Sequence, residues 1–192
     1  MNYSKNKILI DFFLSILFLL FFFWVILIII VYLKITIGSP VFFIQTRVGQ
    51  FEKCFKLIKF RTMKIDTDNL GTHLLKGNVL TKNGSFLRRF KLDELPQVFN
   101  VFLCQMSFVG PRPCLTNQNE IIKERSKRNI FNLKPGITGL SQINNIDMSR
   151  PKYLSKVDLL YKKNISLKLD ILMIFSTLIG RGINKDQMRK KV

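Results

Sequence analysis

Hydrophobic and polar positions divide the chain into a long apolar segment near its start and a mixed body behind it. Residues 12–33, FFLSILFLLFFFWVILIIIVYL, form a run of 22 residues without a charged side chain. A helix of about 20 apolar residues crosses the hydrocarbon core of a bilayer. The run is too long for the apolar part of a signal peptide, and no small-residue cleavage site follows it. The pattern predicts a membrane-inserted helix over residues 1–37; a fully buried core helix is the alternative.

The body of the chain, residues 38–192, has the size of one domain and alternates short apolar runs with polar turns. The β-prone runs VFFIQ (41–45) and CFKLIKF (54–60) flank a polar turn and predict a hairpin. Apolar positions at helical spacing predict helix within residues 86–102. Further expectations are a loop at 65–85, turns at 107–114 and 134–139, and a polar helix at 117–130.

A second apolar run lies near the other end of the chain, within residues 167–182. After Asp170 it continues for only about ten residues, which is too short to span a bilayer. Its apolar residues suit either a core helix or an amphipathic helix in the membrane interface, and the sequence leaves both open. They are Leu169, Leu172, Ile174, Phe175, Leu178 and Ile179. The predicted fold class is α+β: a membrane-inserted helix, then a compact, mostly helical domain with a small β-hairpin and interfacial amphipathic helices.

The charge of the chain points to anionic partners. Lys and Arg number 31 against 12 Asp and Glu, for a net charge of +19. Such a surface attracts nucleic acid, an anionic membrane face or phosphorylated substrates. All basic residues except Lys5 and Lys7 follow the apolar run, so the positive-inside rule places the body in the cytoplasm. The three cysteines show no C-x-x-C spacing, which argues against a zinc site or a disulfide framework, and His73, the single histidine, is expected in a loop without a catalytic role.

Asp93 and Glu94 form the only adjacent acidic pair and follow closely on Arg88 and Lys91. Pro96 comes just after them, and because proline is favoured in the first turn of a helix, the pair is expected at a helix start. One interpretation is a helix cap, since acids there interact favourably with the helix dipole. The other is a phosphate site, in which the carboxylate has a lowered pKa and acts as a nucleophile or holds a divalent cation.

Several motifs occur in a fixed order behind the apolar run. They are GSPVFF (38–43), Gln45-x-Arg47-x-Gly49, KFRTM (59–63), LDELPQVFNV (92–101), SFVGPRP (107–113) and KPGITG (134–139). This order resembles the bacterial sugar transferase family, the monotopic phosphoglycosyl transferases, in its minimal catalytic form. The resemblance extends from about residue 11 to about residue 182.

The resemblance implies a reaction. Family members transfer a sugar-1-phosphate from a UDP-sugar to undecaprenyl phosphate or another polyprenyl phosphate, release UMP and require Mg²⁺, which starts the assembly of a bacterial glycoconjugate or polysaccharide. Carried over, Asp93 is the nucleophile that forms a covalent phosphosugar-enzyme, and it also lies at the metal. Glu94 is its partner, which either helps to deprotonate the lipid phosphate or binds the metal. Two displacements avoid bringing two polyanions together in one step.

The resemblance also assigns the basic motif residues. Lys59, Arg61 and Arg112 match positions that hold phosphates, and Arg88 matches a position near the membrane, where a lipid phosphate lies. Asp158 is a weaker candidate for the metal region. The implied location is the cytoplasmic face of the bacterial inner membrane, with anionic phospholipid as a further partner and no nucleic acid. The resemblance leaves open whether the chain forms a homo-oligomer.

One departure from the family concerns the apolar helix. Relatives commonly carry a Ser-Pro in its middle, which kinks the helix so that it re-enters the cytoplasmic leaflet; here Phe23-Trp24 occupies that place. We expect both ends of the helix in the cytoplasm, with a spanning helix as the alternative. The rival functions are a membrane-tethered basic protein that binds nucleic acid without enzymatic activity, and a purely structural membrane scaffold.

Overall fold

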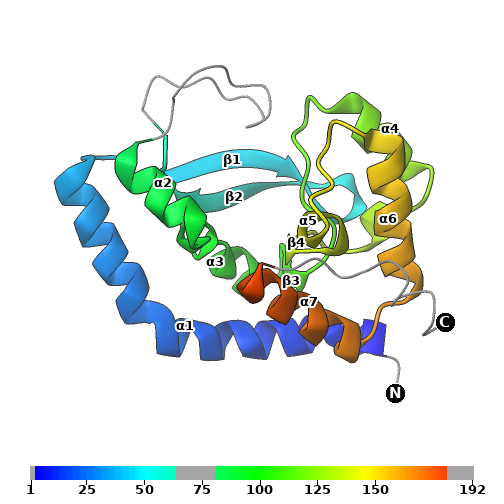
Figure 1. Cartoon of the computed structure of the whole chain (residues 1–192). Helices are drawn as coiled ribbons and strands as arrows, with labels where there is room; N and C mark the ends of the chain where they lie inside the picture. Colours follow the sequence, from blue (N-terminus) through cyan, green and yellow to red (C-terminus); the bar gives the residue numbers. More distant parts are fainter. Residues whose placement is uncertain (1–2, 64–80, 181–192) are drawn as a thin grey trace.

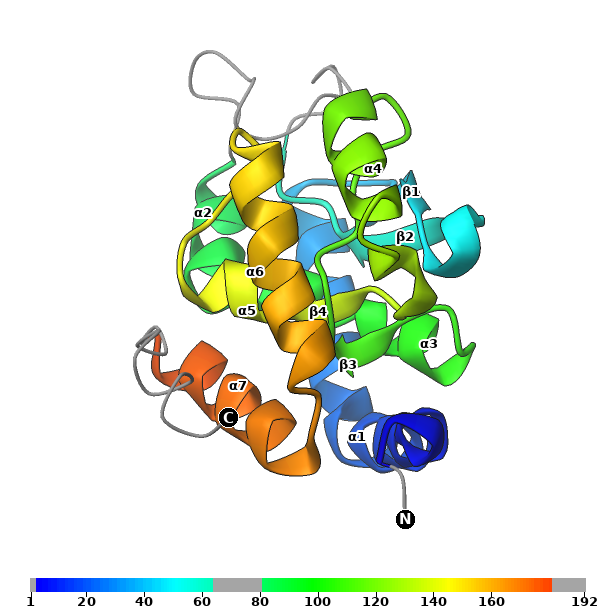
Figure 2. The same cartoon turned by 90° about the vertical axis from the view of Figure 1, so that its right-hand side faces the viewer.

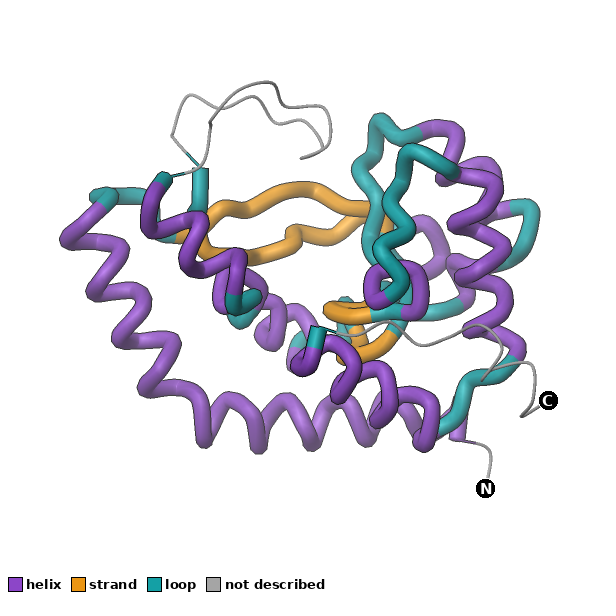
Figure 3. The backbone as a smooth tube through the Cα atoms, in the orientation of Figure 1, coloured by secondary structure: helices purple, strands orange, loops and turns teal. Residues whose placement is uncertain are grey.

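The computed structural model of the protein describes residues 3–63 and 81–180. It is a mostly helical molecule with two small sheets and a long N-terminal helix that underlies the rest (Figures 1 and 3). The α+β class with a long apolar helix is therefore confirmed. His73 and most of the loop predicted at 65–85 lie outside the described residues.

The N-terminal helix, α1, runs unbroken from Tyr3 to Thr36. Residues 6–36 of it are long and apolar enough to cross a membrane by length and composition. Figure 1 shows that α1 bends into two arms although the sequence places no proline in it. Large apolar side chains of the helix face outward: Leu20, Phe21, Trp24, Ile28 and Ile35 are 66–79% exposed. Few of its side chains are buried in the domain, which argues against the alternative of a soluble core helix.

The two arms of α1 pack against different parts of the domain. In the first arm, the ring of Phe12 stacks on Phe102, with 5.4 Å between the centroids. In the second arm, Ile29 and Leu33 belong to a buried cluster that also contains Leu87. These separate contacts hold the bent shape of α1 although no proline kinks the helix.

The chain leaves α1 at a left-handed glycine. Gly38 has φ 87° and its N–H bonds to the Leu33 carbonyl at 3.2 Å, which ends the helix next to the predicted boundary at residue 37. The strands β1 (Phe42–Val48) and β2 (Cys54–Phe60) follow as an antiparallel hairpin with the 3₁₀ turn η1 (Gln50–Glu52) between them. The predicted hairpin is confirmed, and its first strand extends three residues further.

The predicted helical region 86–102 consists of three pieces. Helix α2 (Lys82–Arg89) begins earlier than predicted and is capped by Thr81, whose side chain accepts a hydrogen bond from Gly84 N at 2.9 Å. The 3₁₀ turn η3 (Leu92–Glu94) and helix α3 (Gln97–Phe102) follow. Lys91 separates α2 from η3 because its φ of 55° is left-handed and incompatible with a continuous helix.

The two predicted turns contain a small parallel sheet. Strand β3 (Ser107–Val109) pairs with β4 (Gly136–Thr138), so the expectation of turns alone at 107–114 and 134–139 was wrong. The strands are three residues each, and their flanking prolines and glycines dominated the sequence pattern. Gly110 is required at this junction because a Cβ there would lie 2.4 Å from the Lys134 carbonyl. The intervening chain forms α4 (Asn119–Ser126), within the predicted polar helix, and the 3₁₀ turn η4 (Ile130–Asn132).

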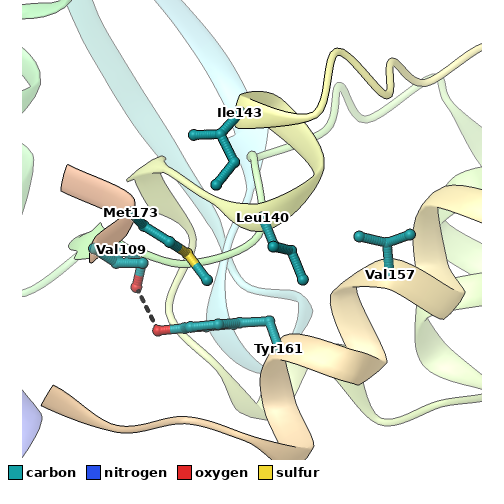
Figure 4. Packing of buried hydrophobic residues seen from close by; sticks show 6 residues of the cluster. All are labelled: Val109, Leu140, Ile143, Val157, Tyr161 and Met173. Atoms are coloured by element: carbon teal, nitrogen blue, oxygen red, sulfur yellow. Dashed lines mark hydrogen bonds between the residues drawn. The ribbon is translucent and has the colours of Figure 1, made fainter. Parts of the chain in front are cut away.

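The last helices complete the core. Helices α5 (Leu140–Ile143), α6 (Pro151–Lys163) and α7 (Leu167–Ile179) pack against β3, as Figure 4 shows. Six residues form the centre of this cluster: Val109, Leu140, Ile143, Val157, Tyr161 and Met173. The Tyr161 hydroxyl donates to the Val109 carbonyl at 3.2 Å, which ties α6 to β3.

Helix α7, for which the sequence left a core helix and an interfacial helix open, has one buried face and one exposed apolar face. Met173 is fully buried in the core, whereas Phe175, Leu178 and Ile179 are 57–76% exposed. Figures 1 and 2 show α7 beside the beginning of α1. Lys7 of α1 forms an ion pair with Asp170 of α7, whose other carboxylate oxygen accepts a hydrogen bond from the Tyr161 hydroxyl at 2.8 Å. One face of α7 thus packs on the domain and the other presents apolar side chains outward, which favours an interfacial helix.

Candidate active site

The acid pair lies in the turn between α2 and α3. Lys91 redirects the chain, the 3₁₀ turn carries Asp93 and Glu94, and Pro96 stands directly before the first residue of α3. The expectation that the acid pair lies at a helix start is confirmed, because the pair directly precedes α3. Asp93 is buried, whereas the Glu94 side chain is 17% exposed. Asp93 therefore points into the domain and Glu94 lies at the rim.

Basic side chains from three elements surround this turn. Lys59 comes from the end of β2, Arg88 from the last turn of α2, and Arg112 from the loop behind β3. Both terminal nitrogens of Arg112 lie 3.2 Å from Glu94 Oε1. The Arg88 Nε donates to Thr62 Oγ1 at 2.9 Å, which fixes its guanidinium beside the turn. Segments far apart in the sequence thus converge on the acid pair, as its predicted role as a phosphate site requires.

The pKa of Asp93 runs opposite to the sequence-based expectation. Burial raises the pKa of this carboxyl above its ordinary value of 3.8, and the neighbouring Glu94 raises it further. Lys59 and Arg88 lower the pKa, but they do not outweigh burial. The predicted lowering of the pKa was therefore wrong, because the sequence shows the basic neighbours of Asp93 but not the removal of water from it.

Lys59 is a strongly perturbed base of the site. Burial lowers the pKa of its ammonium to about 8, and the positive charges of Arg112 and Arg47 act in the same direction. Glu94 and Asp93 oppose this shift. The lysine therefore loses its proton as the pH rises through about 8, and a bound anion would favour the charged form.

Two further arginines hold the loop that presents Arg112. Arg125 of α4 donates from Nη1 to the Arg112 carbonyl at 2.7 Å. Arg47 of β1 donates from Nη1 to the carbonyl of the next residue, Pro113, at 3.2 Å. The Cys114 carbonyl accepts the Val48 N–H at 3.0 Å. Three consecutive carbonyls are thus fixed from outside the loop, which gives the Arg112 side chain a defined origin.

Asp158 is the buried counter-ion of Arg125. Its Oδ2 lies 2.9 Å from Arg125 Nε and 2.8 Å from Nη2, and both side chains are 2% exposed. Its Oδ1 accepts a hydrogen bond from Ser141 Oγ at 3.3 Å. In this arrangement both oxygens of Asp158 are engaged, and the residue connects to Arg112 through Arg125.

The remaining predicted site residue, Arg61, directly follows β2, and its backbone N–H bonds to the Val41 carbonyl at 2.8 Å. The charge of Arg61 is not among the main influences on the pKa of Asp93. Sequence reasoning assigned no role to Arg47 and Arg125. The Gln45-x-Arg47 spacing was a usable signal for Arg47, because alternate residues of a strand share a face. Arg125 lies in the run KERSKR, and nothing distinguishes it there from solvated charges.

The carboxylates of the turn suit a magnesium ion. Within residues 3–63 and 81–180 no group of three or more His, Cys, Asp or Glu side chains gathers into a metal site. Mg²⁺ does not need such a group, because it usually binds to one or two carboxylates, several waters and the phosphates of a substrate. Asp93 and Glu94 offer that donor set, and their position among cations suits a ligand that carries phosphate.

This geometry favours chemistry on a phosphate. A buried carboxylate with a raised pKa is a stronger base and nucleophile when ionised than a solvated one. The surrounding ammonium and guanidinium groups can neutralise phosphate oxygens and hold them in place. An acid pair alone is a common helix cap. The bases that converge on it from separate elements favour a phosphate site over a simple cap.

Comparison with known proteins assigns the chain to a family. The sequence model for bacterial sugar transferases matches residues 2–181, which is nearly the whole chain. The chain belongs to this family, as the order of its motifs indicated.

Individual relatives support the same assignment. The uncharacterised sugar transferase EpsL of Bacillus subtilis is 39% identical over 160 residues, which cover 81% of this chain and 79% of that protein. The UDP-glucose:undecaprenyl-phosphate glucose-1-phosphate transferase of Klebsiella pneumoniae is 40% identical over 161 residues, or 79% of this chain. An N-acetylgalactosaminephosphotransferase of Aeromonas hydrophila, which its name links to undecaprenyl phosphate, is 32% identical over 158 residues. The matched segment is 35% of the Klebsiella enzyme and 37% of the Aeromonas enzyme.

Proposed function

We propose that the protein transfers a sugar-1-phosphate from a UDP-sugar to undecaprenyl phosphate and releases UMP. The observation that carries this proposal is the position of Asp93 and Glu94 among Lys59, Arg88 and Arg112. The names of the Klebsiella and Aeromonas relatives supply the substrate classes. They act on different sugars, so the family assignment does not select one. Nothing in the comparisons supports the alternative of a nucleic-acid-binding protein.

The first chemical step uses Asp93. One of its carboxylate oxygens attacks the phosphorus that carries the sugar, and the bond from that phosphorus to the oxygen bridging to UMP breaks. UMP leaves with the electron pair of that bond, and the sugar phosphate remains on Asp93 as an acyl phosphate. Burial favours the attack because it removes water from the carboxylate, while Lys59 and Arg112 offset the charge of the phosphates.

The second step regenerates the enzyme. A phosphate oxygen of the lipid attacks the same phosphorus, the bond to Asp93 breaks, and the products are a polyprenyl diphosphate sugar and a free carboxylate. Arg88 holds the lipid phosphate in this proposal, which is supported by the packing of the adjacent Leu87 with Ile29 and Leu33 of the apolar helix. Mg²⁺ held by Asp93 and Glu94 would neutralise phosphate oxygens during transfer.

We further propose that α1 inserts into the cytoplasmic leaflet and returns, so that both its ends face the cytoplasm. The bend in Figure 1 and the ion pair between Lys7 and Asp170 support this topology. A helix that crossed the membrane would carry Lys7 to the face opposite α7. The apolar outer face of α7, with Phe175 and Leu178, would then lie in the headgroup region of the bacterial inner membrane.

One assay tests the function directly. The purified protein in detergent or lipid nanodiscs is incubated with a panel of UDP-sugars, Mg²⁺ and undecaprenyl phosphate, and UMP release is measured. The proposal expects UMP in excess over the amount of enzyme only when the correct UDP-sugar and the lipid are both present. An absence of UMP with every sugar tested, from protein that is shown to be folded, would count against the reaction.

A further inference from the structure

Positively charged side chains outnumber negatively charged ones in the site. The described Arg, Lys, Asp and Glu side chains that influence one another's ionisation there are four bases and two acids: Arg47, Lys59, Arg88, Arg112, Asp93 and Glu94. The thiol of Cys114 also acts on Arg47, but burial raises its pKa and keeps it neutral. With every base protonated, the group carries two surplus positive charges. The diphosphate of a nucleotide sugar carries two negative charges. The surplus therefore matches the donor of the proposed reaction, on which the present inference rests.

Arg47 contributes to this surplus, and the charge of Glu94 opposes the lowering of its pKa only as the smallest effect. Within the described part of the chain, no Asp or Glu oxygen forms an ion pair with its guanidinium. Burial lowers the pKa of Arg47, to about 10, and the charge of Arg112 lowers it further. Burying an unpaired cation is costly unless an anion accompanies it. The environment of Arg47 is thus that of a cation whose counter-ion is a ligand.

One N–H donor of Arg47 has no hydrogen-bond partner among the described residues. Its Nη2 donates to Gln45 Oε1 at 2.5 Å, and its Nη1 donates to the Pro113 carbonyl at 3.2 Å. Its Nε is buried and has no hydrogen-bond partner among the described residues. Gln45, buried on the same face of β1, fixes the plane of the guanidinium. An orphaned, oriented N–H on a buried cation is an anion-binding group.

We propose that Arg47 binds the diphosphate of the UDP-sugar through its Nε edge, together with Lys59 and Arg112. Gln45 is the positioning residue that orients it. Arg47 keeps its hydrogen bond to the Pro113 carbonyl when the UDP-sugar is bound. It therefore connects the phosphates of the UDP-sugar to the loop that carries Arg112.

The position of Arg47 in the fold favours the nucleotide over the lipid phosphate. Phe42, at the start of β1, belongs to the cluster that contains Leu33 of α1. Arg47 lies five residues further along the strand, where it pairs with Leu115 near α4. Figure 1 shows β1 running from the α1 end of the molecule towards α4 and α6. Arg47 is therefore at the end of the hairpin away from the apolar helix, and Arg88 is at the end close to it.

The test compares Arg47→Met and Arg47→Lys with the wild type as full-length proteins in detergent. Binding of UDP in the presence of Mg²⁺ is measured by calorimetry, and the KM for the UDP-sugar and for undecaprenyl phosphate by UMP release. Losing a charge-assisted hydrogen bond should raise the Kd of UDP in Arg47→Met by about tenfold to a hundredfold. Arg47→Lys keeps the charge but not the oriented N–H, so a smaller increase is expected. The KM for the lipid should change little.

Lys56→Met is the matched control. Lys56 lies on the same hairpin but on the opposite face, where its Nζ donates to Thr46 Oγ1 at 2.9 Å, and its removal takes away one positive charge outside the site. Its Kd for UDP should stay within twofold of the wild type. If Arg47→Met does not fold, as judged by its thermal unfolding transition, Arg47→Lys decides the question alone.

Arg47 would be only a positioning residue if it acted solely through the Arg112 loop. The double variant Arg47→Met/Arg112→Ala distinguishes the two, because independent contacts multiply their effects on Kd and a shared effect does not. The inference is overturned if the double variant binds UDP as Arg112→Ala does, if both Arg47 variants match Lys56→Met, or if only the KM for the lipid rises. A wild type that neither binds UDP nor releases UMP would instead overturn the proposed function itself.

Discussion

Lys7 of the apolar helix α1 forms an ion pair with Asp170 of α7, at the opposite end of the chain, and the Tyr161 hydroxyl holds the other carboxylate oxygen. Lys7 and Asp170 are both buried. The contact joins the beginning of the helix to the domain that follows its end. It therefore bears on topology: the two ends of α1 must lie on the same side of the membrane for this pair to exist.

The first prediction concerns that topology. A single cysteine at Ser4, in a background without Cys54, Cys104 and Cys114, should resist a membrane-impermeant maleimide in intact cells and react after permeabilisation. The reason is that Lys7, three residues away, is fixed to the domain that follows α1, which we propose lies in the cytoplasm. A cysteine introduced into a known periplasmic loop of another protein serves as the labelling control. Labelling of the Ser4 cysteine from outside would show a spanning helix.

The second prediction concerns the buried pair of Arg125 and Asp158. Asp158→Asn leaves a buried guanidinium without its counter-ion, which should cost about 3–5 kcal/mol of unfolding free energy. Turnover should also fall, because Arg125 holds the Arg112 carbonyl. The matched control is Lys127→Met, which removes an ion pair with Glu124 whose lysine side chain is 56% exposed, and which should cost much less. Denaturant unfolding in detergent measures both.

The same variant tests whether Asp158 is a metal residue. As the counter-ion of Arg125, its replacement should lower turnover at every Mg²⁺ concentration without changing the concentration that gives half-maximal activity. A large increase in that concentration for Asp158→Asn, with an intact unfolding transition, would instead support Asp158 as part of the metal region and contradict the purely structural role.

The third prediction concerns Arg112. Its side chain is 42% exposed and its ion pair with Glu94 contributes little to stability, so Arg112→Ala should fold normally. Its turnover should fall by the loss of a charge-assisted phosphate contact, on the order of 1.5–3 kcal/mol or more in transition-state stabilisation. Steady-state kinetics with the UDP-sugar measure the loss. Unchanged parameters would exclude a phosphate role for the loop behind β3.

The fourth prediction is a pH dependence set by Lys59. Its pKa in the folded protein is about 8, so it loses its positive charge as the pH rises through that value. The kcat/KM for the UDP-sugar, which reports the free enzyme, should therefore fall above about pH 8. Lys59→Arg should shift this decline to higher pH because a guanidinium stays protonated. A wild-type profile that stays flat to pH 9.5 would contradict this assignment.

The acidic limb of the same profile reports the carboxylates. Asp93 must be ionised to attack phosphorus, and its pKa is raised by burial and by Glu94. Activity should therefore decline, as the pH falls, at a pH above the ordinary carboxyl value of 3.8. Because the two acids interact, the apparent value belongs to the pair. Glu94→Gln removes one negative charge, so it should slow turnover strongly and move the acidic limb to lower pH.

Much of the architecture follows from the sequence for local reasons. The hairpin depends on β-prone runs on either side of a polar turn, and α1 depends on a continuous apolar run, and both signals are complete within one segment. The parallel pairing of β3 with β4 is different, because each strand is three residues long and its partner is more than 20 residues away. The bend of α1 likewise has no local sequence signal, since no proline lies in the helix. Its cause lies in contacts with distant residues such as Phe102 and Leu87.

Some features of the site also follow from the sequence, whereas others appear only in the folded structure. Motif order identified Asp93, Glu94 and the bases around them, because each belongs to a recognisable short stretch. The direction of the Asp93 pKa could not be predicted, since burial is a property of the folded chain. The role of Arg125 could not be predicted either. Only the fold shows that Arg125 lies buried beneath the Arg112 loop, whereas its neighbours Lys127 and Arg128 lie nearer the surface.

The central claim is that Asp93 carries the phosphosugar during the reaction. The most direct measurement incubates the enzyme with the correct UDP-sugar and Mg²⁺ but without lipid, quenches it and analyses the peptides by mass spectrometry. The account predicts one added sugar phosphate on Asp93 in the wild type, loss of this adduct when undecaprenyl phosphate is added, and neither adduct nor turnover in Asp93→Asn. An adduct on a different residue, or UMP release by Asp93→Asn at the wild-type rate, would contradict it.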